Sequence, residues 1–97
     1  MRKRNTESIG EVLKQYFEEN TFLKRKVAES RVVTGWSKML GAGLASYITN
    51  VYLRRDVLYV HLNSAALRQE LMMAKERLMK NLNEHAGMHV VNDIVFR

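Results

Sequence analysis

The chain has 97 residues, 46% of them hydrophobic and 27% charged, which is the size and composition of one globular domain. Cysteine is absent, which excludes a disulfide framework and thiolate chemistry and is compatible with the cytoplasm, where we expect the protein to work. The longest predominantly apolar stretch, residues 39–48, is too short to span a bilayer, which takes about 20 residues.

The net charge is +6, the sequence pI is about 9.9, and the basic excess is uneven. Residues 1–56 hold eleven Lys and Arg against six Asp and Glu, a net charge of +5, whereas residues 57–97 are close to neutral. This imbalance favours a polyanionic partner, nucleic acid above all, although a basic protein can also carry such charge without a function.

The first half of the chain predicts two helices. We expect residues 1–7 to be a disordered basic tail and residues 8–97 to form one domain. Thr6 can cap a first helix, whose apolar residues recur at helical spacing up to Phe17 and which ends at Asn20 and Thr21; we expect it to pack on the sheet or on the next helix, with docking on a partner as the alternative.

A second helix is expected over residues 23–40. Gly35 lies inside it and should weaken it by about 1 kcal/mol relative to alanine, so an interruption there is plausible. Trp36 is interpreted as a core anchor, or, if it were exposed, as a contact for a protein partner.

A turn at residues 41–43 precedes a short helix over residues 44–47 and a first strand over residues 49–54. A tight turn at residues 54–56 leads into a strand from Val57, in which apolar Leu58, Val60 and Leu62 alternate with polar or aromatic residues. The pattern predicts an antiparallel hairpin with two arginines at its tip.

The spacing of leucines predicts one long amphipathic helix over residues 65–86, capped by Ser64 or Asn63 and ended by Gly87. We expect Met72 and Met79 to lie in the core. A last strand falls between Val90 and Phe96 and can pair parallel to the strand before the helix. The fold class is therefore α+β, a small three-stranded sheet with the N-terminal helices packed on it.

No residues form a compelling catalytic or metal site. His85 and His89 are four apart, but Gly87 ends the helix between them. Ser64, His61 and Asp93 contain the elements of a nucleophile, a base and an acid, yet nothing in their spacing requires them to meet. We expect no enzyme activity, no cofactor and no metal.

Several short motifs together resemble one protein family. They are Trp36 followed by Gly41, Leu58-x-Val60, the run from Ser64 to Leu71, and Val91-x-Asp93-Ile94-x-Phe96-Arg97. In order and spacing, from Ser8 to Arg97, they look like the DciA family. The resemblance implies a KH-like domain in chromosome replication that helps to load the replicative helicase onto single-stranded DNA. The chain departs from true KH domains because residues 41–43 lack the GxxG spacing that clamps RNA.

The leading hypothesis is a non-enzymatic adaptor that binds the replicative helicase and, weakly and in a salt-sensitive way, single-stranded DNA. The candidate phosphate contacts are Lys24, Arg25, Lys26, Arg54 and Arg55, and the candidate partner contacts are Trp36, Arg68 and Gln69. The alternatives are a general RNA-binding module and a protein-interaction domain whose basic charge is incidental.

Overall fold

A computed structural model describes residues 8–97, apart from the side chain of Phe17. The predicted basic tail and the predicted cap at Thr6 lie outside these residues. The elements in chain order are α1 (Ile9–Glu19), α2 (Thr21–Leu40), α3 (Ala42–Ala45), β1 (Ile48–Arg54), β2 (Val57–Leu62), α4 (Ala65–Met73), α5 (Lys75–Ala86) and β3 (Asp93–Phe96). The predicted α+β class is confirmed, whereas the KH-like label stays a prediction.

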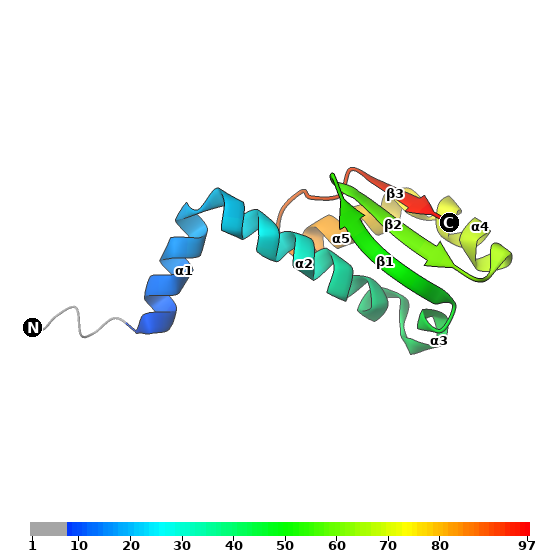
Figure 1. The fold of residues 1–97 in the computed structure, drawn as a ribbon, viewed down its shortest axis with the longest axis horizontal. Coiled ribbons are helices and arrows are strands. Elements are labelled where there is room, and N and C mark those ends of the chain that lie inside the picture. The colour runs from blue at the N-terminus through cyan, green and yellow to red at the C-terminus, as the bar shows by residue number, and fades with distance from the viewer. Residues whose placement is uncertain (1–7) are drawn as a thin grey trace, which may run out of the picture.

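The three strands form one sheet in the order β1-β2-β3 (Figure 1). β1 pairs antiparallel with β2, which confirms the predicted hairpin, and β2 pairs parallel with β3, as expected for two strands joined through a helix. Arg55 and Asp56 turn the hairpin with positive φ angles of 51° and 67°. Two consecutive left-handed residues match the twist of the flanking strands, which explains a loop this short.

One face of the sheet is covered by helices, and the core lies there. Helices α2 and α5 lie behind the sheet in Figure 1. Leu58 and Val60 of β2 are fully buried, and Ile94 of β3 is almost so, which confirms the alternation predicted for β2. Trp36 on α2 is also fully buried, and its ring lies 6.2 Å from that of Phe96, between centroids. The interpretation of Trp36 as a core anchor is confirmed.

The prediction of one long helix after β2 is wrong, because the chain forms two helices with a break at Ala74. A straight helix over residues 65–86 would be about 33 Å long, while the strands it must cover are about 20 Å long. The break lets α4 lie against β2 and β3 while α5 packs on α2. It also leaves Met72 52% exposed, so its predicted place in the core is wrong, whereas Met79 packs against the core.

Both predicted caps of this region are confirmed. The Ser64 hydroxyl accepts a hydrogen bond from the Leu67 N–H at 3.2 Å, which satisfies a backbone donor that has no partner inside α4. Gly87 ends α5 in the left-handed conformation with φ of 86°.

Helix α2 runs unbroken through Gly35, so the predicted interruption is wrong. A β-carbon at Gly35 would lie 2.6 Å from Cδ2 of His85, and therefore the glycine lets α2 and α5 approach closely. The start of α2 also differs from the prediction. The first helix ends at Glu19, so its predicted end at Asn20 is confirmed, whereas Thr21 is already the first residue of α2. The Asn20 side chain caps α2 by accepting from the Leu23 N–H at 3.0 Å.

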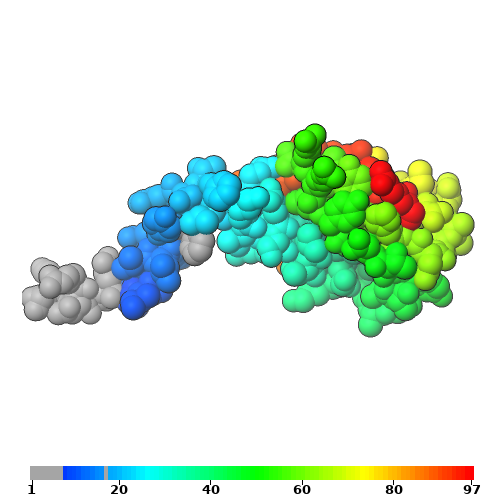
Figure 2. Space-filling view, in the orientation of Figure 1, coloured from blue at the N-terminus to red at the C-terminus, as the bar shows by residue number. Residues whose placement is uncertain are grey.

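Helix α1 projects away from the sheet as an arm (Figures 1 and 2). It contacts α2, so packing on the next helix is confirmed, but it does not cover the sheet. Its cap is Ser8, which exchanges two hydrogen bonds with Glu11, each 3.1 Å long. The main contacts of α1 are with α2, and its apolar side chains Ile9, Val12, Leu13 and Tyr16 stay exposed.

Candidate nucleic-acid and partner interfaces

The hairpin tip presents two basic side chains to solvent. Arg54 is the last residue of β1, Arg55 is the first turn residue, and both are exposed. Within residues 8–97, neither arginine forms an ion pair. Both guanidinium groups are thus free to contact an anion, and their role in binding phosphates stays a prediction.

The three consecutive basic residues on α2 do not form one patch. The Arg25 Nε lies 3.3 Å from Glu29, and its Nη2 also pairs with Asp56 in the hairpin turn. Lys26 pairs with Glu29 at 3.6 Å, with its Nζ 5.5 Å from the centre of the Phe22 ring. Arg25 therefore ties α2 to the hairpin, and its charge is largely compensated.

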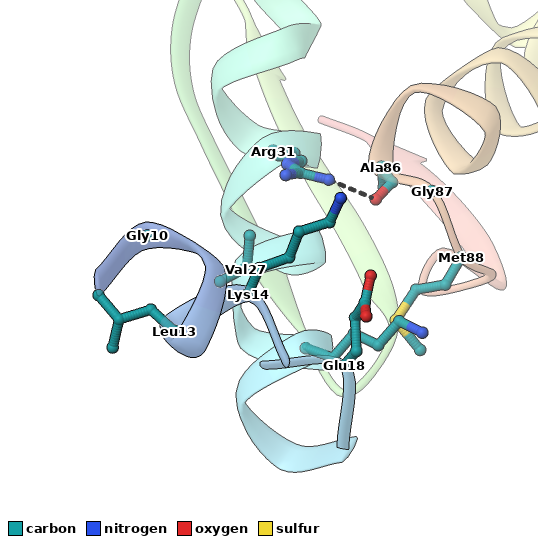
Figure 3. Close-up of a pocket in the computed structure, with 10 residues that line it drawn as sticks. Gly10, Leu13, Lys14, Glu18, Val27, Arg31, Ala86, Gly87 and Met88 are labelled. Carbon is teal, nitrogen blue, oxygen red and sulfur yellow. Dashed lines mark hydrogen bonds between the residues drawn. The ribbon is translucent and has the colours of Figure 1, made fainter. Parts of the chain in front are cut away.

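Lys24, the remaining member of the triplet, lines a pocket of about 540 Å³ (Figure 3). The pocket lies between α1, α2 and the loop after α5. Lys14 and Arg31 point into it, and Arg31 donates a 3.4 Å hydrogen bond to the Ala86 carbonyl. Its lining mixes apolar, basic and acidic side chains: Gly10, Leu13, Lys14, Glu18, Lys24, Val27, Arg31, Ala86, Gly87 and Met88. This mixed lining does not define one ligand.

The three candidate partner contacts lie in different environments. Trp36 has no exposed surface, so direct contact with a partner would require it to leave the core. Arg68 is half-buried and donates from Nη2 to the Leu62 carbonyl at 3.4 Å, which holds it at the end of β2. Gln69 is exposed on α4. Of the three, Gln69 has the most exposed surface, and the role of all three in binding a partner stays a prediction.

The open face of the sheet carries an aromatic stack that the sequence reasoning missed. Tyr52 lies opposite Tyr59 in the β1–β2 register, and their ring centroids are 5.0 Å apart with planes inclined by 17°. The His61 ring lies 5.7 Å from Tyr52, and the Arg97 guanidinium lies 5.1 Å from the centre of Tyr59. We call these four residues, in the order Arg97, Tyr59, Tyr52 and His61, the sheet stack.

The sequence places the residues of the sheet stack on one face, but only the strand register shows that they lie side by side. Tyr59 and His61 alternate with the buried residues of β2, so the sequence placed both on the opposite face. A two-residue turn pairs Arg54 with Val57 and therefore Tyr52 with Tyr59. Arg97 joins them because β3 pairs parallel to β2, and its N–H donates to the Val60 carbonyl at 2.8 Å.

The acidic groups near this face are compensated by basic partners. Asp93 on β3 lies 2.7 Å from the Lys75 ammonium. That hydrogen bond lowers the pKa of Asp93, and a bond from the Ile94 N–H adds to the effect. Asp56, in the hairpin turn, pairs with Arg25. The arginines near the sheet stack are therefore not opposed by free carboxylates from these two positions.

The residues considered for catalysis do not come together. Asp93 pairs with Val57 in the sheet, four residues along β2 from His61, which corresponds to about 13 Å. The Ser64 hydroxyl is engaged as the cap of α4. Among residues 8–97, no three His, Cys, Asp or Glu side chains are grouped to hold a metal ion. His89 instead bonds Asn92 at 2.7 Å.

The fold and these surfaces define a small basic α+β domain whose exposed features suit binding to other macromolecules. The chain belongs to the DciA family, since the model described as "Dna[CI] antecedent, DciA" matches residues 8–96. This is a family of DNA replication and helicase loading, so the resemblance noted in the sequence is confirmed.

The other comparisons add no relatives. No curated protein and no solved structure matches the chain. Over residues 8–97, no helix is both long and apolar enough to cross a membrane.

Proposed function

We propose that the protein is a non-enzymatic, cytoplasmic adaptor that binds the replicative helicase and assists its loading onto single-stranded DNA. The observation that carries the proposal is the family match over residues 8–96. The net charge of +6 and the exposed arginines at the hairpin tip support the DNA part, because free guanidinium groups attract phosphates.

The exposed face of α1 supports the helicase part. Its apolar side chains lie at positions i, i+3, i+4 and i+7, which place them on one face: Ile9 at 78% exposure, Val12 at 48%, Leu13 at 50% and Tyr16 at 55%. An amphipathic helix with its apolar face in solvent is suited to a protein partner. We assign the helicase contact to this face.

Capture of the purified replicative helicase by the full chain tests the helicase part. The double variant Val12→Asp/Tyr16→Asp places charge on the apolar face of α1 and should lower capture at least tenfold. Gln15→Asp is the control for charge on α1, because it places one negative charge, against two in the double variant, on another side of the same helix. Unfolding followed by Trp36 fluorescence should be unchanged in both, since α1 contacts little besides α2.

Failure of the unmodified chain to capture the helicase would refute the helicase part. Normal capture by the double variant would refute only the placement of the contact on α1.

Binding of labelled oligonucleotides in a salt series tests the nucleic-acid part. Affinity for single-stranded DNA should fall steeply with salt, with a logarithmic slope of about −0.7 for each phosphate neutralised. Preference for structured RNA over single-stranded DNA in the same series would instead favour the RNA-binding alternative. Salt-independent binding would show that phosphate contacts do not contribute.

A further inference from the structure

We propose that the sheet stack is a binding site for the bases of an unpaired DNA strand, with the arginines around it holding the phosphates. The inference rests on the proposed binding of single-stranded DNA and goes beyond it by assigning the bases as the ligand and the open sheet face as the site. The residues are Tyr52 and Tyr59 for stacking, His61 and Arg97 at the two ends, and Arg54 and Arg55 at the hairpin tip.

The geometry of the stack leaves ring surface for a ligand. The centroids of Tyr52 and Tyr59 are 5.0 Å apart in nearly parallel planes. Contacting carbon atoms are about 3.5–4.0 Å apart, so the two rings must be offset, and each keeps part of its face uncovered. Figure 2 shows this side of the sheet with no helix over it. Bases can therefore stack on the uncovered parts of these two rings.

The charge around the stack matches a nucleic-acid backbone. Arg54 lies on the same face as Tyr52, two residues along β1, and Arg97 lies against Tyr59. Asp93 and Asp56, the nearby acids, are paired with Lys75 and Arg25. The stack is thus flanked by cations at the hairpin tip and by the Arg97 guanidinium, which can itself stack on a base.

Unpaired bases fit this surface better than a duplex does. In a duplex the base faces are hidden within the stack of base pairs, and exposing one costs a few kcal/mol. Single strands present their faces freely, and aromatic side chains on a positively charged surface bind them with little sequence preference. The tyrosine rings offer stacking surface, which points to tolerance of sequence.

The test compares two labelled strands of about 12 nucleotides, within the usual site size. One is oligothymidine and the other has the same phosphates but abasic sugars. Tyr59→Ala and Tyr52→Ala should each weaken oligothymidine binding at least about fivefold, because stacking on one aromatic side chain contributes that much or more. The same variants should bind the abasic strand as the unmodified chain does, which also shows that they are folded.

Three further variants separate stacking from charge. Tyr59→Phe keeps the ring and should bind like the unmodified chain. Phe22→Ala removes an exposed aromatic ring on α2 and should leave the affinity for oligothymidine unchanged. Arg54→Gln should reduce the magnitude of the salt slope by about 0.7, whereas Tyr59→Ala should leave the slope unchanged.

The inference is overturned if the unmodified chain binds both strands equally, or if the tyrosine variants bind oligothymidine normally. Binding of single-stranded DNA, as proposed above, would survive either result. If neither strand binds at low salt, the stacking site and the DNA part of the proposed function both fall, while capture of the helicase remains a separate measurement.

Discussion

The two faces of the sheet are built from the same strands but have different roles. On the face toward α2 and α5, Leu58, Val60 and Ile94 are at most 2% exposed. On the opposite face, Tyr52, Tyr59 and His61 remain partly exposed and stack on one another. Because side chains alternate along a strand, one short sequence can specify a core and a separate binding surface. The covered face should thus govern stability and the open face binding.

The largest expected difference between the faces comes from truncating one residue on each. Leu58→Ala should lower the free energy of unfolding by about 3 kcal/mol, since it leaves a cavity in a fully buried site. Tyr59→Ala should lower the free energy of unfolding by about 1 kcal/mol, which is what one pair of side chains on neighbouring strands contributes. Urea unfolding followed by Trp36 fluorescence measures both. Equal losses would show that the open face is part of the core.

The stability of α4, which lies in the connection between β2 and β3, depends on its N-terminal cap at Ser64. Ser64→Ala should lower the free energy of unfolding by about 1 kcal/mol because the Leu67 N–H loses its partner. Ser64→Asp should restore most of the loss, since its carboxylate can accept the same bond. If Ser64→Ala leaves the free energy of unfolding unchanged but lowers the affinity for a partner, Ser64 belongs to a binding surface.

The close contact between α2 and α5, behind the inner face, can be tested with a double-mutant cycle. In a His85→Ala background, Gly35→Ala should stabilise the protein by about 0.5–1 kcal/mol through helix propensity. With His85 present the gain should shrink or reverse, because the new β-carbon would lie 2.6 Å from the imidazole. Thermal unfolding of the four proteins measures the coupling, and additive effects would contradict the contact.

The smallest effect is expected at the edge of the open face. Asp93→Asn should cost less than about 1 kcal/mol, because the Asp93–Lys75 pair is substantially exposed and screened. Lys75 lowers the pKa of Asp93 in the folded protein. The ion pair therefore stabilises the fold at pH values above the pKa of Asp93 in the unfolded chain, about 3.9, and this stabilisation is lost as the pH falls through the lower pKa of the folded state. Unfolding curves of both proteins at several pH values should converge in acid. If the difference in free energy of unfolding between the two proteins grew in acid, the stabilising role of the Asp93–Lys75 pair would be contradicted.

Local signals in the sequence were enough for much of the fold. The hairpin, the caps at Ser64 and Gly87 and the alternation of β2 each depend on a few neighbouring residues, and all three were predicted. The two exposed arginines followed for the same reason, because a tight turn between two strands places its residues in solvent.

The errors arose where distant segments meet. The break at Ala74 follows from the length of the sheet that α4 and α5 must cover, and helical periodicity continues through it unchanged. Gly35 weakens a helix in isolation, yet it is needed where His85 approaches α2. The role of the basic triplet on α2 in binding phosphates stays a prediction, but the sequence of α2 could not show that Arg25 is engaged by Asp56 from the hairpin turn.

By itself, the sequence determined the fold class, the family and which residues of β2 face the core, because these depend on composition, periodicity and short motifs. Only the tertiary structure decided which charges are free and which aromatic rings meet. The sheet stack joins residues from β1, β2 and Arg97 beyond β3, up to 45 positions apart in the chain. Strand register brings them together, and register is set by pairing across the sheet.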